Sequence, residues 1–285
     1  MMRHELSAYG LDAVIERALA EDLGAGDLTT EACIDPETMA VASAVARAPM
    51  VACGGPVFER VFYAIDTSLV VEHVAEEGSL VAAQTTLWTV SGPARSILMG
   101  ERVALNFVQR MVGIATMART YVDAAASAGE GTHTRIADTR KTTPGLRALE
   151  RYAVRVGGAH NHRDNLGSAV LIKDNHIAAC GGVREAIVRA RARAPHTSRI
   201  ECEVDTLEQL DEALLAGADI VLLDNMNDET VAEAVRRARG KAITEASGGI
   251  TLARVPALAR LGIDIISVGA LTHSVKSADV GLDFA

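Results

Sequence analysis

The feature that most constrains the fold is a regular alternation of short apolar runs with helical stretches in the second half of the chain. These runs are apolar on both faces, which is typical of strands in a parallel sheet covered by helices. Six runs occur, at 134–137, 169–172, 199–204, 219–223, 242–244 and 264–268, and helical patterns lie at 145–156, 183–194, 207–216, 228–239 and 252–261. The rhythm predicts an α/β domain, and both a doubly wound sheet and a (β/α) barrel satisfy it.

The residues that follow the apolar runs favour the barrel. Each run ends in polar or charged side chains or in glycine, and in a barrel these ends converge on one mouth, where active sites lie. The ends are Asp138-Thr139-Arg140-Lys141, Lys173-Asp174-Asn175-His176, Glu203 with Asp205, Asp224-Asn225, Glu245 with Ser247-Gly248-Gly249, and Gly269-Ala270. No run is followed by the GxGxxG fingerprint of a dinucleotide-binding sheet. Because six repeats are visible, we expect an open, incomplete barrel of the TIM type.

The first half of the chain has a different pattern. Alternating residues at 39–48, 69–75 and 85–90 predict short antiparallel strands, and 56–65 predicts a helix. An amphipathic helix is expected at 7–23 with Ser7 as its N-cap, and the helical sequence at 94–128 is expected to break near Gly113. We therefore expect an N-terminal α+β sandwich domain at 1–112 and a barrel domain at 113–274, with a tail at 275–285 that packs back on the first domain.

Composition and charge exclude several classes of protein. The 285 residues carry a formal net charge of -9, which argues against non-specific binding to nucleic acid. No apolar run approaches the ~18 residues of a membrane span, and residues 1–30 lack the apolar core of a signal peptide. The four cysteines form no CxxC pair, so we expect reduced thiols, no zinc site and a cytoplasmic location.

Basic residues gather between Arg135 and Lys173, where eight arginines and lysines face three acidic residues. Three of these arginines repeat every fourth residue within 147–155, which is typical of a solvated helix face. The candidate ligand-binding residues of this segment lie at run ends or in a glycine-rich loop, and they include one histidine: Arg140, Lys141, His162, Arg163 and Lys173. Cations that converge at a barrel mouth suit a small polyanion, because arginine grips carboxylates in bidentate geometry and lysine supplies a point charge.

The last two run ends suit a phosphate. Glycine lets backbone amides approach an anion, and the loops after the final strands of barrels often bind phosphate. Ser247-Gly248-Gly249 and Gly269-Ala270 are two loops of this kind. One such loop alone is commonly just a turn, whereas two in successive repeats favour a phosphate site.

Two carboxylates lie between the cationic and the glycine-rich segments. Glu203 and Asp224 each follow an apolar run. Carboxylates in such a place hold ribose hydroxyls, or Mg²⁺ through water. Their alternative role is structural, as ion-pair partners of Lys173 or Arg140.

Taken together, these motifs resemble the quinolinate phosphoribosyltransferase family almost from end to end. In the first half the resemblance rests on Glu21-Asp22-Leu23-Gly24, Gly26-Asp27-Leu28-Thr29-Thr30, Glu101-Arg102, Leu105-Asn106 and Gly113-Ile114-Ala115-Thr116. In the second half it rests on 138–142 (DTRKT), Pro144-Gly145, 161–163 (NHR), 171–176 (LIKDNH), Glu201 with Glu203, 223–225 (LDN), Glu245 with 247–249 (SGG), and 269–274 (GALTHS). DTRKT, NHR and LIKDNH in this order are highly specific.

The resemblance implies a reaction and an assembly. The family transfers phosphoribose from phosphoribosyl pyrophosphate to the ring nitrogen of quinolinate, and it releases pyrophosphate and CO₂ to give nicotinate mononucleotide for NAD biosynthesis. Mg²⁺ is the implied cofactor, and no covalent nucleophile is needed. The implied assembly is a homodimer with shared active sites, which in turn can assemble into a higher oligomer.

The resemblance also assigns roles to individual residues. Those implied to bind quinolinate are Arg102, Arg140, Lys141, His162, Arg163 and Lys173, with Arg102 reaching the site of the partner subunit. Those implied to bind phosphoribosyl pyrophosphate are Lys173, Glu203, Asp224, Ser247, Gly248, Gly249, Gly269 and Ala270. Glu203 and Asp224 are the implied Mg²⁺ ligands, and the implied catalytic residues are Lys141, Lys173, Glu203 and Asp224.

Three positions depart from the usual residues of the family. Val112 stands where serine is common, Ala159 where glycine is common, and Ser168 where aspartate is common. None of the three is an implied ligand contact. The departures therefore bear on fine tuning rather than on activity.

Three other functions remain as alternatives. The nearest is a paralogue of the same fold, either the relative associated with molybdenum transport or a phosphoribosyltransferase that uses nicotinate. A decarboxylating enzyme must bind both carboxylates of its substrate. The chain has enough basic side chains for two carboxylates, namely Arg102, Arg140, His162 and Arg163, and this favours the decarboxylating enzyme. A catalytically dead binding protein would lack a lysine or an acid of the set, and a phosphate-binding isomerase or synthase would leave DTRK and NHR unexplained.

Overall fold

The computed structural model describes residues 10–129 and 131–285, and they form two compact units. The first unit consists of the chain up to Arg119 together with Thr142–Gly158 and Leu271–Ala285. The second consists of Thr120–Lys141 and Ala159–Ala270. The first unit therefore also contains a segment of the barrel domain expected from the sequence. No helix in the described ranges is long and apolar enough to cross a membrane.

The first unit is built on a four-stranded antiparallel sheet in the order β12-β1-β5-β3. Its strands are β1 (Met39–Ala46), β3 (Val70–His73), β5 (Thr86–Pro93) and β12 (Val280–Phe284), and a separate pair joins β2 (Met50–Val51) to β4 (Leu80–Val81). The aromatic centre of the core is Phe58, whose ring centroid lies 4.9 Å from that of Phe62 and 5.2 Å from that of Trp88. The C-terminal strand β12 lies beside β1, so the tail is part of this sheet.

The helices of the first unit are α1 (Leu11–Leu23), α2 (Leu28–Cys33), α3 (Gly55–Ile65), most of α4 (Ala94–Ala126) and α5 (Arg147–Val156). The short helix α11 (Ala270–His273) begins at the passage from the second unit to the first. Helix α1 buries Ile15 and Leu19 on its apolar face, and the expected cap Ser7 lies outside the described residues. Helix α2 begins where the Asp27 carboxylate accepts the Thr30 N–H at 3.0 Å, a standard N-cap.

Helix α4 is one continuous helix of 33 residues, so the break expected near Gly113 is wrong. Gly113 serves close packing instead, because a Cβ at this position would lie 2.3 Å from the backbone oxygen of Lys276. The C-terminal segment runs against the helix here, and the Ala278 N–H donates to the Gln109 backbone oxygen at 2.8 Å. A glycine inside a helical pattern indicates either a break or a close approach, and only the tertiary contact tells them apart.

The second unit contains a six-stranded parallel sheet in the order β6-β11-β10-β9-β8-β7. The strands are β6 (Arg135–Ala137), β7 (Val170–Ile172), β8 (Ile200–Val204), β9 (Ile220–Asp224), β10 (Ile243–Ser247) and β11 (Ile265–Ser267). Successive strands are neighbours and the last lies beside the first, so the order closes a circle except between β6 and β7. A doubly wound sheet would instead reverse its order at a switch point. The expected open α/β barrel is confirmed.

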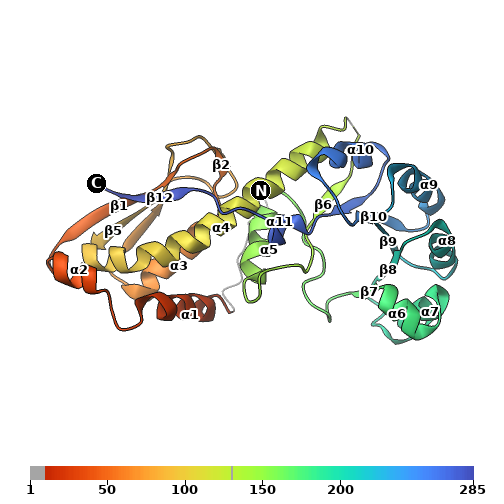
Figure 1. Cartoon of the computed structure of the whole chain (residues 1–285), viewed down its shortest axis with the longest axis horizontal. Coiled ribbons are helices and arrows are strands. Elements are labelled where there is room, and N and C mark those ends of the chain that lie inside the picture. Colours follow the sequence, from red (N-terminus) through yellow and green to blue (C-terminus); the bar gives the residue numbers. More distant parts are fainter. Residues whose placement is uncertain (1–9, 130) are drawn as a thin grey trace. The chain divides into compact units, whose positions relative to one another are not determined.

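Helices connect the strands of the second unit and lie on the outer side of the sheet (Figure 1). They are α6 (Asp174–Cys180), α7 (Val183–Arg193), α8 (Leu207–Leu215), α9 (Asp228–Ala238) and α10 (Val255–Arg260), the last preceded by a 3₁₀ turn η1 (Leu252–Arg254). The side chains of Thr206 and Asn227 cap α8 and α9. Helix α6 was not expected as a separate element, because its sequence follows β7 directly as a polar motif.

Candidate active site

A cavity of about 360 Å³ lies at the C-terminal ends of the barrel strands, within the second unit. Eight of the expected site residues line it, namely Arg140, Lys141, His162, Arg163, Lys173, Glu203, Asp224 and Ser247. Five further lining residues had no expected role, namely Thr139, Leu171, Leu222, Glu245 and Ser267. The fold thus brings side chains from the ends of six strands and from the loop before β7 to one place.

The remaining expected residues do not line this cavity. Gly248 and Gly249 adjoin Ser247 in the loop after β10, and Gly269-Ala270 follows β11. Arg102 is an exposed residue of α4 in the first unit.

The loop after β10 requires glycine at position 248. Gly248 has a φ of +82°, and a Cβ there would lie 2.3 Å from Oδ1 of Asn225 and 2.8 Å from Oδ1 of Asp224. Asn225 itself has a φ of +53°, and its backbone N–H donates to the Ser247 oxygen at 3.1 Å. No separate role for Asn225 was expected from the sequence. Its signal was present, since asparagine after a strand is among the few residues that tolerate the left-handed region.

The Lys173 ammonium and the Glu203 carboxylate form an ion pair across the cavity, with Nζ 2.6 Å from Oε2. Glu203 is 13% exposed and Lys173 45% exposed, so the pair lies at the cavity wall and remains open to solvent. In this structure Glu203 is therefore an ion-pair partner of Lys173, as the alternative role stated for it predicts. Asp224 instead accepts the side-chain amide of Asn225 at 2.7 Å. Each carboxylate uses one oxygen in these contacts.

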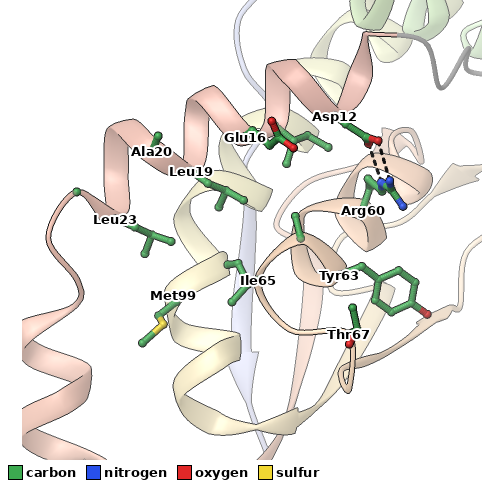
Figure 2. Close-up of a pocket in the computed structure, with 13 residues that line it drawn as sticks. Asp12, Glu16, Leu19, Ala20, Leu23, Arg60, Tyr63, Ile65, Thr67 and Met99 are labelled. Atoms are coloured by element: carbon green, nitrogen blue, oxygen red, sulfur yellow. Dashed lines mark hydrogen bonds and ion pairs between the residues drawn. The ribbon is translucent and has the colours of Figure 1, made fainter.

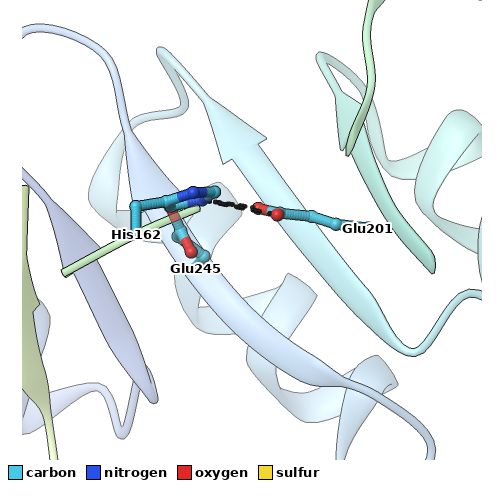
Figure 3. Close-up of side chains that lie close together, drawn as sticks. All are labelled: His162, Glu201 and Glu245. Carbon is cyan, nitrogen blue, oxygen red and sulfur yellow. Dashed lines mark hydrogen bonds and ion pairs between the residues drawn. The ribbon is translucent and has the colours of Figure 1, made fainter. Parts of the chain in front are cut away.

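His162, Glu201 and Glu245 form a compact cluster (Figure 3), and two of its members, His162 and Glu245, line the cavity. His162 Nε2 lies 3.3 Å from Glu201 Oε2 and 3.5 Å from Glu245 Oε1, and both carboxylates are nearly fully buried. Burial opposes the charged ring, but the two carboxylates outweigh it and raise the pKa of His162 to about 10. Burial also raises the pKa of Glu201.

A backbone hydrogen bond beside the cluster determines which nitrogen of the His162 ring carries the proton. The Arg163 N–H donates to Nδ1 of His162 at 2.7 Å, a contact that requires a lone pair on Nδ1. Protonation of both ring nitrogens would remove this bond, so the carboxylates and the amide act on the ring in opposite directions. In the neutral ring the proton is on Nε2, which then donates to Glu201 and has no lone pair for a metal. We therefore interpret the cluster as a hydrogen-bonded one.

Two guanidinium groups stand close together at the cavity. Burial and the neighbouring Arg140 lower the pKa of Arg163, yet arginine remains charged because its ordinary pKa is far above neutral. One Arg163 nitrogen, Nη1, donates to the Ala169 oxygen at 3.1 Å, which fixes its side chain. Repulsion between two fixed cations is relieved when an anion binds between them. The pair is therefore suited to a carboxylate.

A second, larger cavity of about 870 Å³ lies in the first unit between α1 and α3 (Figure 2). Its walls include Ile15, Leu19 and Met99. Arg60 and Asp12 at its edge form a bidentate pair, with both hydrogen bonds 2.7 Å long. This cavity gathers no set of converging cations, so it offers much less chemistry than the smaller cavity.

The cysteines offer no nucleophile to the cavity. Burial raises the pKa of Cys202 on β8 to about 12 and raises that of Cys53 well above its ordinary value. The thiolate is the reactive form of cysteine. Both thiols are therefore unreactive at neutral pH, and all four cysteines are unpaired.

Comparisons with known proteins match most of the chain to one group. The quinolinate phosphoribosyl transferase N-terminal domain matches residues 27–112, and the C-terminal domain of the same description matches residues 114–283. Nicotinate-nucleotide pyrophosphorylase (carboxylating) of Mycobacterium leprae is 45% identical over 276 residues, which cover 94% of this chain and 95% of that protein. The human protein of the same name is 39% identical over 275 residues, covering 95% and 91%. The solved structure of the nicotinate-nucleotide pyrophosphorylase from Francisella tularensis has a TM-score of 0.94 at 35% identity and covers 99% of this chain and 98% of that one.

Proposed function

The chain belongs to the quinolinate phosphoribosyltransferase family, and from this premise we propose that it converts quinolinate and phosphoribosyl pyrophosphate into nicotinate mononucleotide, pyrophosphate and CO₂. The observation that carries the proposal is the set of four cationic side chains in one cavity, namely Arg140, Lys141, Arg163 and Lys173. Both substrates are polyanions, and a concave site lined by one sign of charge attracts the opposite charge.

Quinolinate binds between the two segments that carry the arginines. Arg140 and Arg163 each offer a planar fork to one carboxylate, and Lys141 adds charge beside them. His162 lines the same cavity, with its Nε2 held near Glu201 and Glu245. Because Arg140 and Arg163 each bind one carboxylate, the site selects a dicarboxylate over nicotinate, which has a single carboxylate.

The sugar phosphate binds along the other half of the cavity. The bond between C1 of the ribose and pyrophosphate breaks, and the ring nitrogen of quinolinate forms the new bond to C1. The neighbouring carboxylate then leaves as CO₂, its electron pair stays on the adjacent carbon of the cationic pyridinium ring, and that carbon takes up a proton. Glu203 and Asp224 face the ribose, and Lys173 attracts the departing phosphates. Positioning and electrostatics supply most of the acceleration.

Mg²⁺ is the proposed cofactor, and the donor set of the cavity fits it. Glu203 and Asp224 supply only oxygen ligands, which a hard cation prefers, and each has one oxygen outside its contact with Lys173 or Asn225. These two carboxylates would hold the ion. When bound, it neutralises negative charge on the leaving pyrophosphate.

The first test supplies purified protein with Mg²⁺, phosphoribosyl pyrophosphate and either quinolinate or nicotinate. Equal amounts of CO₂ and nicotinate mononucleotide from quinolinate, with no product from nicotinate, are expected. Product from nicotinate alone would favour a nicotinate-using paralogue. A folded protein that binds phosphoribosyl pyrophosphate and converts neither substrate would overturn the proposed reaction.

We also propose a cytoplasmic homodimer in which Arg102 of one protomer completes the quinolinate site of its partner. The exposure of Arg102 on α4 supports this role. The variants Arg102→Ala and Lys173→Ala should each be nearly inactive alone. Mixed dimers should regain activity, because one of their two sites keeps both residues. Activity that stays absent after subunit exchange, verified with differently tagged chains, would place Arg102 outside the partner's site.

A further inference from the structure

We propose that Asp138 is a positioning residue that fixes the two quinolinate-binding segments against each other. The inference rests on the proposed function and adds a residue to it that touches no substrate. The two segments are 139–141, which contains Arg140 and Lys141, and 161–163, which contains His162 and Arg163. In sequence they are separated by helix α5, and in space they meet at the end of strand β6.

The Asp138 carboxylate joins them directly. Its Oδ1 accepts the His162 backbone N–H at 2.7 Å, and its Oδ2 accepts the Asn161 side-chain amide at 2.6 Å. Its own backbone N–H donates to the His160 oxygen at 3.0 Å. The side chain of Asp138 is fully buried. One residue therefore makes two hydrogen bonds to the second segment and one to His160 directly before it, and in the chain it directly precedes the first segment.

The backbone around Asp138 extends the sheet beyond its last regular residue. His160 forms a parallel bridge with Ala137, and its N–H donates to the Ile136 oxygen at 2.8 Å. Segment 160–162 thus takes the place beside β6 at which the open barrel lacks a strand. The loop 163–169 that follows has no strand pairing within the described residues, so the direction in which the Arg163 backbone leaves this short bridge depends on the Asp138 contacts, while the bond from Nη1 to the Ala169 oxygen holds the end of its side chain.

The phosphoribosyl pyrophosphate half of the cavity does not depend on these contacts. Glu203, Asp224 and Ser247 are placed by β8, β9 and β10, which pair with one another in regular register. A disturbance at Asp138 should therefore act on one substrate and spare the other. A residue that only stabilised the fold would disturb both halves together.

The test compares Asp138→Ala and Asp138→Asn with the wild-type enzyme. Loss of both side-chain acceptors should raise the KM for quinolinate by roughly 10²-fold, since a misplacement of about 1 Å has effects of that size. The KM for phosphoribosyl pyrophosphate should change by less than about twofold. Asp138→Asn keeps an oxygen for the His162 N–H and pairs with a flipped Asn161 amide, so it should recover most of the loss.

Two further variants keep the test decisive. Asn161→Ala removes one hydrogen bond to the Asp138 carboxylate and keeps the other, from the His162 N–H. It should raise the quinolinate KM by a smaller factor than Asp138→Ala does. This variant can be measured even where Asp138→Ala fails to fold. Asp264→Ala is the matched control. Asp264 also accepts two hydrogen bonds, both from Thr244, but it directly precedes β11 and so lies away from the C-terminal strand ends that form the cavity. It should lower the melting temperature and leave both KM values unchanged.

The outcomes separate the two proposals. Wild-type protein that makes no nicotinate mononucleotide overturns the proposed function. Wild-type activity together with an unchanged quinolinate KM in folded Asp138→Ala, or with equal increases of both KM values, overturns the positioning role alone. An Asp138→Asn variant as impaired as Asp138→Ala would also contradict it, because the effect would then come from the negative charge.

Discussion

Replacing Lys173 by alanine is expected to lower kcat/KM by roughly 10³-fold, mostly through kcat. The ammonium is already held 2.6 Å from Glu203 Oε2 at the end of β7, so it needs no rearrangement to meet developing negative charge. Without it, the departing pyrophosphate loses a fixed cation and Glu203 adds uncompensated negative charge to the cavity. Initial rates with both substrates varied separately measure the effect.

The matched control for this experiment is Lys241→Ala, which removes an exposed lysine from the turn before β10. It should leave kcat and both KM values near those of the wild type. If Lys173→Ala raised KM without lowering kcat, Lys173 would contribute only to binding. If both variants behaved alike, the ion pair with Glu203 would have no part in the reaction.

The barrel could be predicted from the sequence because its signal is local. A strand buried on both faces must be apolar throughout, and a strand that ends at an open mouth must be followed by polar residues or glycine. Runs such as 219–223 with Asp224 behind them meet both conditions. The opening between β6 and β7 could not be predicted in detail, since it depends on which strands fail to pair.

The candidate site was predictable to the extent that its residues follow strands. Arg140, Lys173 and Asp224 do so, and they line one cavity. Glu201 and Glu245 are different, because a buried acid inside an apolar strand has no local signal that separates a partner of histidine from an ordinary charge. Their contact with His162 joins residues that are 39 or more positions apart, and only the folded sheet reveals it.

The incorrect prediction of a helix break at Gly113 also arises from a contact between residues far apart in the sequence. Helix propensity counts glycine as a weak point of about 1 kcal/mol relative to alanine, and nothing local offsets it. The offset comes from the Lys276 backbone, which lies too close for any side chain at position 113. A long helix that carries a required glycine therefore depends on tertiary packing for its continuity.

Replacing Arg110 by alanine is expected to reduce the free energy of unfolding by about 3–5 kcal/mol. The Arg110 guanidinium pairs with Glu150, which is only 1% exposed, and its Nη2 also donates to the Thr143 hydroxyl and the Thr272 backbone oxygen at 2.8 Å each. These partners are 40, 33 and 162 positions away, which is why no sequence pattern indicated the network. Removing the arginine leaves a buried carboxylate without its cation.

Urea unfolding with a double-mutant cycle distinguishes this cause from a simple loss of packing. Arg110→Met combined with Glu150→Leu should recover part of the loss, because the uncompensated buried charge is then gone. Arg236→Ala breaks an exposed pair with Glu233 and should leave the urea midpoint nearly unchanged. A double variant less stable than either single variant would mean that Arg110 acts through the Thr143 and Thr272 contacts alone, and that the charge of Glu150 is tolerated by its surroundings.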